Sequence, residues 1–310
     1  MNYKKIVSLS ISLCTIICVW FIIVRHWNEF TLLFFQVNTY TLTWICLTQI
    51  CLITSSGLPF KTLYSVLGIE ITTMDWISMS FAGNLANYTA PFRPSLAVRY
   101  VFMKCRYQST LTDIAIVTAA YSLFTFIIAI CLIITLNLVT PPKHHLTHIW
   151  IFFLLLVTLV IIAGTNKLAS LDRLATILPN KASIFLDNLR SFKCSPKLCL
   201  QLAPQFIAIN ILGGIAYFFA FKALGISTNI PTLLMIAPLT TLAGWFSLTP
   251  ANIGVTETLV GALLEYSSGD FSVGFLATSI VRLTHIGVSI FLGSISSFYL
   301  MSKINSTNSA

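Results

Sequence analysis

Long apolar runs, separated by short polar connections, recur along the whole chain. A helix that crosses the hydrocarbon core of a membrane needs about 20 apolar residues, and each run is long enough to cross or nearly so. The runs cover residues 6–24, 40–56, 112–137, 149–165, 199–221, 231–248 and 271–300. The first follows Lys4 and Lys5 and lacks a signal-peptide cleavage pattern, so we expect it to remain as a span. The pattern predicts an all-α, polytopic transmembrane helical bundle of about seven or eight spans.

We expect one integral membrane domain, residues 1–310, built from two halves. The first half covers residues 1–140 and the second covers residues 149–301. Each half contains an interrupted segment, which is predicted to be a broken or re-entrant helix: residues 71–99 in the first half and 249–266 in the second. Paired broken helices in two halves of a membrane protein are typical of a substrate site near the middle of the membrane.

Polar residues and prolines interrupt both segments. Those of the first segment are Asn84, Asn87, Thr89, Pro91, Arg93 and Pro94. Proline cannot continue a helix without losing a backbone hydrogen bond, so the helix is predicted to end or kink near Ala90. In the second segment, residues 249–254 separate the run 231–248 from a short apolar helix predicted at 255–266. Because non-helical backbone at membrane depth must be surrounded by protein or a water-filled cavity, both breaks indicate an internal polar site.

Basic residues indicate the orientation of the helices. The only extended polar stretch, residues 166–198, is rich in Lys and Arg, so the positive-inside rule predicts a basic cytoplasmic loop. Lys4 and Lys5 place the N-terminus on the same side, as do the basic residues between the second and third full spans. These assignments agree only if residues 71–91 enter the membrane and return. This count of basic residues places both breaks at the cytoplasmic side. It therefore favours two halves related by a parallel repeat over two halves related by an inverted one.

Composition excludes a water-soluble globular protein. Of the 310 residues, 56% are hydrophobic and only 9% are charged, and the mean hydropathy is +0.88, whereas soluble domains carry about 25% charged residues. Orientation signals and anionic lipids explain the net charge of +9, so we expect no nucleic-acid partner. The 8 cysteines form no CxxC pair and no nucleotide-binding motif occurs. We therefore expect free thiols, no metal site and no cofactor.

Two charged residues in the second half are candidates for a buried ion pair. Glu257 lies in the first turn of the short helix that follows the second break, and Arg282 lies some ten residues into the last apolar run. Ionisable groups inside a membrane are costly and usually functional, so each needs a partner. The alternatives are that Glu257 caps its helix and that Arg282 extends to the nearer interface.

Arg93 and Arg99 flank Pro94 on the return limb of the first broken segment. The planar guanidinium group suits the recognition of phosphate, which favours a binding role beside the break. The alternative is that both are positive-inside residues in solvent, the interpretation that we prefer for Lys104 and Arg106.

Both broken segments resemble the lysylphosphatidylglycerol synthase transmembrane-region family, also called the flippase-like family. Residues 84–99 resemble its pattern of Asn, apolar residues, Pro, a basic residue and a later Arg, and residues 250–257 resemble its Pro-x-x-x-Gly-Val-x-Glu motif. Arg282, in the last apolar run, also matches an arginine that the family carries in its final span. The family tends to have Gly near Ser95 and paired glycines at Ala251 and Asn252. The resemblance implies a substrate-binding role, with no catalytic residue, for Asn84, Pro91, Arg93, Arg99, Pro250, Gly254, Glu257 and Arg282.

The resemblance also implies a domain that moves lipids between leaflets. The best-known relatives move aminoacylated phosphatidylglycerol and carry a separate cytoplasmic synthase domain. The 310 residues contain no such domain, so we expect any aminoacyl lipid to be made by another enzyme. The expected partners are a membrane phospholipid or lipid-linked substrate and a separate lipid- or polysaccharide-synthesising enzyme, and the expected location is the inner or plasma membrane.

Three functions follow, in this order. The first is a flippase-like transporter in which arginines hold a lipid phosphate and Glu257 balances charge. The second is a membrane transferase acting on a lipid or lipid-linked glycan, with Glu257 or Asp75 as base; such enzymes usually carry clustered acids or histidines, which are few here. The third is a non-transporting scaffold for envelope lipid or polysaccharide synthesis.

Overall fold

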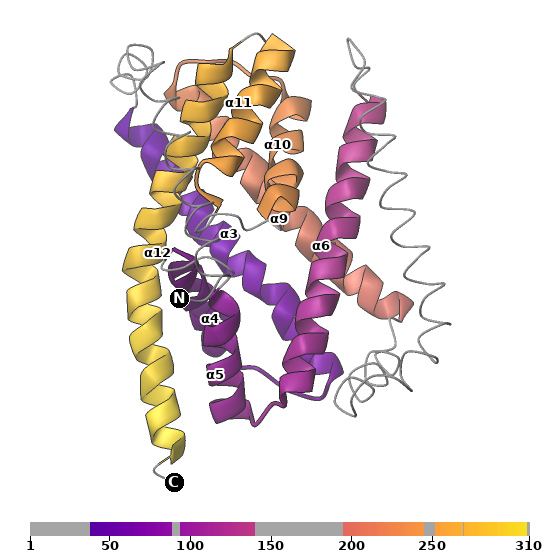
Figure 1. The fold of residues 1–310 in the computed structure, drawn as a ribbon, viewed down its shortest axis with the longest axis vertical. Helices are drawn as coiled ribbons and strands as arrows, with labels where there is room; N and C mark the ends of the chain where they lie inside the picture. Colours follow the sequence, from indigo (N-terminus) through magenta and orange to yellow (C-terminus); the bar gives the residue numbers. More distant parts are fainter. Residues whose placement is uncertain (1–37, 89–93, 140–194, 245–251, 269, 309–310) are drawn as a thin grey trace, which may run out of the picture.

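The computed structural model describes residues 38–88, 94–139, 195–244, 252–268 and 270–308, and all regular structure in them is helical (Figure 1). The eight described helices are α3 (Thr39–Val66), α4 (Thr73–Asn87), α5 (Ser95–Tyr107), α6 (Leu111–Val139), α9 (Pro196–Ala223), α10 (Ile230–Ala243), α11 (Val255–Ser268) and α12 (Phe271–Asn308). Four of them, α3, α6, α9 and α12, are long and apolar enough to cross a membrane. The predicted all-α membrane bundle is confirmed.

Both predicted breaks lie between short helices. The first helix ends at Asn87, upstream of Pro91, and the next begins at Ser95. The second break follows α10, and the predicted short helix is α11. The apolar runs 6–24 and 149–165, and all but the end of the basic loop 166–198, lie outside the described residues.

The described helices repeat one pattern: long, short, short, long. The first helix of each set, α3 or α9, has 28 residues and begins after a capping side chain, Asn38 or Ser195. Each also ends at a Leu-Gly-Ile sequence in which the glycine, Gly68 or Gly225, adopts the left-handed conformation that glycine tolerates best. The short helix that follows begins at a further capping residue four positions later, Thr72 or Asn229. The two halves are therefore structural repeats of each other.

The first helices of the two repeats run in opposite directions. At one end of α3, Trp44 stacks on Phe219, with 5.6 Å between ring centroids. At the other end, the Gln205 amide donates to the Thr62 hydroxyl at 3.0 Å. Low numbers in α3 thus face high numbers in α9, so the two helices are antiparallel and the repeats have inverted topology.

The last helix, α12, shows how the two short-helix hairpins are placed. In its first part, a Cβ on Gly274 would lie 2.6 Å from the Val260 carbonyl oxygen of α11. In its second part, a Cβ on Gly293 would lie 2.9 Å from the Phe81 carbonyl oxygen of α4. The absence of side chains at these glycines allows both short helices to pack closely. Figure 1 shows α11 beside the upper part of α12, with α10 on the far side of α11, and shows α4 and α5 beside the lower part of α12.

The two hairpins therefore enter the bundle from opposite ends, and described residues beside each break line one cavity between them. The expectation that both lie at one side, with a parallel repeat, is wrong. It counted the run 231–248 as a full span that returns the chain to the cytoplasmic side, whereas α10 has only 14 residues and is too short to cross. The second hairpin therefore stays at the side that the chain reaches at the end of α9.

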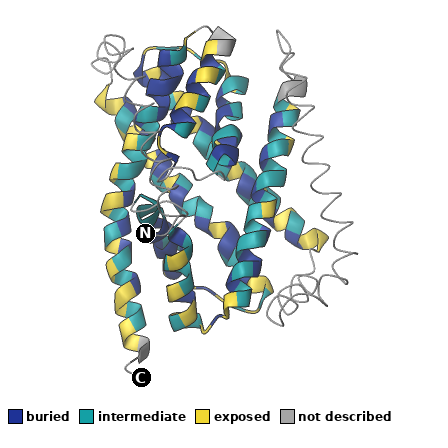
Figure 2. Ribbon diagram, in the orientation of Figure 1, coloured by how far each residue is buried: buried dark blue, intermediate teal, exposed yellow. Residues whose placement is uncertain are grey.

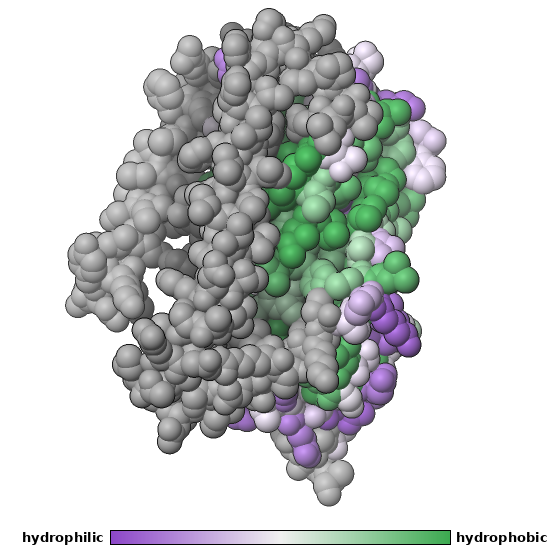
Figure 3. All heavy atoms as spheres, turned by 90° about the vertical axis from the view of Figure 1, so that its right-hand side faces the viewer, coloured by the Kyte–Doolittle hydropathy of each residue, from purple (hydrophilic) through white to green (hydrophobic). Residues whose placement is uncertain are grey.

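Each hairpin has its own apolar core. One core surrounds α4 and α5 and includes Phe102, Met103 and Leu202; the other surrounds α10 and α11 and includes Ile236 and Leu264. Figure 2 shows that exposed residues are frequent along the lower part of α12. On the side that Figure 3 presents, described apolar residues form a broad area and hydrophilic residues gather below it. Such an apolar surface fits a protein surrounded by lipid.

Candidate functional site

The ends of both hairpins meet around a cavity of about 460 Å³. Asn84 and Ser95 line it from the first hairpin, and Asn252 and Thr256 line it from the second. The long helices close the sides, with Gln49 on α3 among the lining residues. Because the cavity lies where the halves of an inverted repeat meet, it occupies the position at which transporters of this architecture bind substrate.

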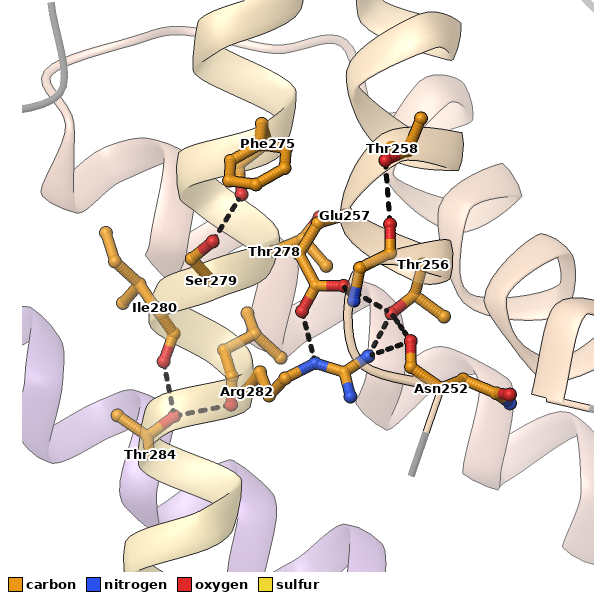
Figure 4. Close-up of polar contacts among 12 residues, drawn as sticks. Asn252, Thr256, Glu257, Thr258, Phe275, Thr278, Ser279, Ile280, Arg282 and Thr284 are labelled. Atoms are coloured by element: carbon orange, nitrogen blue, oxygen red, sulfur yellow. Dashed lines mark hydrogen bonds and ion pairs between the residues drawn. The ribbon is translucent and has the colours of Figure 1, made fainter. Parts of the chain in front are cut away.

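Glu257 and Arg282 form an ion pair beside this cavity (Figure 4). The first carboxylate oxygen of Glu257 contacts the Arg282 Nε atom, and the second accepts hydrogen bonds from the Gly254 amide at 2.8 Å and the Thr256 hydroxyl at 3.1 Å. Arg282 also donates to the Asn252 carbonyl at 3.3 Å and to the Thr256 hydroxyl. Glu257 is only 4% exposed. The predicted pair is present, and Glu257 also caps its helix.

The turn that places Glu257 depends on two residues in left-handed conformation, Asn252 (φ 56°) and Gly254 (φ 86°). Asparagine adopts this conformation more readily than most residues other than glycine, so it can replace the glycine that the family favours. Asn252 is 7% exposed, and its side-chain oxygen has no hydrogen-bond partner among the described residues. It is therefore a buried acceptor in the lining of the cavity.

Arg99 also lines the cavity. Its guanidinium carbon lies 3.7 Å from the centroid of the Phe60 ring on α3, a cation–π contact that holds the planar group in one orientation. The interpretation of Arg99 as a residue of the site is thus supported by its position. Three other predicted site residues, Pro91, Arg93 and Pro250, lie outside the described residues.

A polar chain that the sequence did not predict crosses the cavity from α3 to α4. Gln49, which is 1% exposed, lies 2.8 Å from the Nδ1 atom of His285, and the Nε2 atom of His285 lies 3.4 Å from the Asn84 side-chain oxygen. Asn84 also donates to the Ser80 carbonyl at 2.9 Å. Gln49 is a polar residue inside an apolar run, and this pattern could have indicated a buried polar contact. Its partner, His285, is 236 residues away in the sequence, so the contact itself could not be predicted.

Asp75, the alternative catalytic base, lies away from this cavity. It is 1% exposed at the start of α4 and accepts hydrogen bonds from Tyr107 at 2.6 Å and Tyr299 at 3.0 Å. These bonds join α4, α5 and α12 at the start of α4, whereas the opposite end of α4 lines the cavity. Asp75 and Glu257 therefore do not belong to one site.

Comparison with known proteins agrees with the fold. No curated protein and no solved structure matches the chain significantly. The family model described as the lysylphosphatidylglycerol synthase TM region matches residues 5–293, which is nearly the whole chain. The match covers both breaks, the ion pair and the cavity. The chain is therefore a multi-pass membrane protein that belongs to the lysylphosphatidylglycerol synthase transmembrane-region family.

Proposed function

We propose that the protein moves a phospholipid or lipid-linked headgroup between the two leaflets of the cell membrane through the central cavity. The observation that carries the proposal is the meeting of two inverted half-helix hairpins around a polar cavity halfway along α12. A lipid headgroup that crosses a membrane needs polar contacts in place of water, and this cavity supplies them where hydrocarbon would otherwise lie.

The charges at the cavity suit the phosphate that phospholipid headgroups carry. Arg99 and Arg282 line it from opposite repeats, and guanidinium groups bind phosphate through paired hydrogen bonds. The helix α5 also begins at the cavity, and the N-terminal end of a helix favours an anion. In the second half the Glu257 carboxylate already caps α11 and pairs with Arg282, so the positive potential that a headgroup meets comes mainly from the first half.

We expect the end at which α5 finishes to face the cytoplasm. The described basic residues outside the cavity concentrate there: Lys61, Lys104, Arg106, Lys197 and Lys303. Lys222 lies near the end of α9, at the opposite end of the bundle. Under the positive-inside rule this distribution favours an orientation with the first hairpin at the cytoplasmic side and the second at the outer side.

Replacement of Arg99 tests the proposal. In proteoliposomes with a fluorescent phospholipid, the unaltered protein is expected to make inner-leaflet label accessible to an external quencher. Arg99→Ala is expected to slow this by roughly ten- to a hundredfold, because a hydrogen bond to a charged group contributes about 1.5–3 kcal/mol. Arg106→Ala, an exposed arginine on the same helix, serves as the matched control and is expected to keep the full rate.

The result also separates the other candidate functions. If the unaltered protein moves no lipid but turns over a lipid donor in detergent, it is a transferase. If it does neither and co-purifies with a lipid- or polysaccharide-synthesising enzyme, it is a scaffold. Equal rates for Arg99→Ala and Arg106→Ala would place the lipid path outside the cavity.

A further inference from the structure

The cavity lining differs from what an amine-bearing headgroup requires. Arg99, Arg282 and His285 line it, whereas neither Asp nor Glu does so among the described residues. The nearest carboxylate, Glu257, uses one oxygen for Arg282 and the other for the Gly254 amide and the Thr256 hydroxyl. A lysyl or ethanolamine ammonium group would lose its hydration beside two arginines without gaining a carboxylate partner.

The rest of the lining is rich in hydroxyl groups whose oxygens remain available as acceptors. The Ser56 hydroxyl donates to the Ile53 carbonyl, and the Thr241 hydroxyl donates to the Ala237 carbonyl. A serine or threonine hydroxyl that donates to its own helix still has lone pairs to offer a ligand. These residues line the cavity, so they can accept hydrogen bonds from hydroxyl groups of a headgroup.

Asn252 adds an independent observation. Its side chain is buried, lines the cavity, and has a side-chain oxygen without a hydrogen-bond partner among the described residues. A buried acceptor without a partner is unfavourable, so binding of a ligand whose hydroxyl group donates to it is favoured. The cavity thus combines guanidinium donors for a phosphate with neutral acceptors for hydroxyl groups.

We propose that the cavity binds an anionic phosphodiester headgroup that bears hydroxyl groups, as a glycerol or sugar phosphate does, in preference to one that bears an amine. This inference rests on the proposed function and specifies its substrate class. It distinguishes the chain from its best-known relatives, whose aminoacylated lipid carries added ammonium groups.

The test is an equilibrium binding measurement on the full chain in detergent. Native mass spectrometry compares phosphatidylglycerol, phosphatidylethanolamine and lysyl-phosphatidylglycerol with identical acyl chains. We expect phosphatidylglycerol to bind at least about tenfold more tightly than the lysyl lipid, the effect of a single charge-assisted contact. Equal or tighter binding of the lysyl lipid would overturn the inference.

A carboxylate introduced into the lining should weaken this preference. Thr118 lines the cavity from α6, so Thr118→Asp adds a charge there, and Thr118→Asn is the neutral control of the same shape. We expect the aspartate variant, but not the asparagine variant, to lower the preference for phosphatidylglycerol by about tenfold or more. An unchanged preference in a folded Thr118→Asp protein would contradict the proposal.

Two further measurements complete the test. One distinguishes a lipid ligand from a soluble one, and the other distinguishes a failure of this inference from a failure of the proposed function. Soluble glycerophosphoglycerol is expected to compete weakly, because it lacks acyl chains; affinity equal to that of the lipid would overturn the assignment to a lipid. Binding needs no transport, so a protein that selects phosphatidylglycerol but moves no lipid contradicts only the proposed function. A protein that moves all headgroups equally contradicts only this inference.

Discussion

Arg282→Ala is expected to lower the free energy of unfolding by about 3–5 kcal/mol, because it leaves the buried Glu257 carboxylate without its cation. The same change removes the bonds from Arg282 to the Asn252 carbonyl and the Thr256 hydroxyl, which hold the turn before α11 and the first turn of α11 in place. The measurement is chemical unfolding of purified protein in detergent. Arg106→Ala at the exposed end of α5 is the control, with an expected change within about 0.5 kcal/mol.

A double-mutant cycle shows whether the loss belongs to the pair. Glu257→Ala, Arg282→Ala and the double variant are compared under one condition. Because each single change leaves the other charge unpaired, the double variant should lose less than the two losses combined, with a coupling energy of about 0.5–3 kcal/mol. Strictly additive losses would show that Glu257 and Arg282 act independently and would contradict the pairing in Figure 4.

Ser56→Trp is expected to stop lipid movement. Ser56 lies on α3 and lines the cavity, which holds about 460 Å³, so an indole at this position occupies space that a headgroup needs. We expect the rate of transbilayer movement of fluorescent lipid in proteoliposomes to fall to that of protein-free vesicles. The reason is steric, so the loss should be the same for every headgroup tested.

Leu58→Trp is the matched control for this blocked cavity. Leu58 lies two positions along the same helix, on nearly the opposite face, and is 36% exposed. Both variants must show the unfolding transition of the unaltered protein before their rates are compared. Normal movement in Ser56→Trp, or equal loss in both variants, would mean that lipid does not pass through the cavity.

The fold could largely be predicted from the sequence because membrane spans depend on local composition. The runs 40–56, 112–137, 199–221 and 271–300 all lie within long helices, since a backbone in hydrocarbon must satisfy its own hydrogen bonds. The breaks were equally visible, because proline and glycine end helices through local geometry. The ion pair could be inferred because Glu257 and Arg282 are rare charges in apolar surroundings.

The relation between the two halves could not be predicted in the same way. It depends on contacts between distant residues, such as the stacking of Trp44 on Phe219, which no local pattern encodes. The orientation count was misleading because the run 231–248 was taken for a full span, whereas α10 has only 14 residues. The Leu-Gly-Ile sequences that end α3 and α9 at corresponding positions were a visible sign of the repeat, although they do not give its direction.

The most direct test of the central claim is to locate a lipid headgroup bound to the protein. A phosphatidylglycerol with a photoreactive group on its headgroup glycerol is irradiated in proteoliposomes, and the labelled residues are identified by mass spectrometry. We expect labels at the ends of both hairpins, near Asn84 or Ser95 and near Asn252, because these residues line one cavity from opposite repeats. Labels confined to outward-facing residues such as Leu283 and Phe291 would contradict a headgroup path through the centre of the protein.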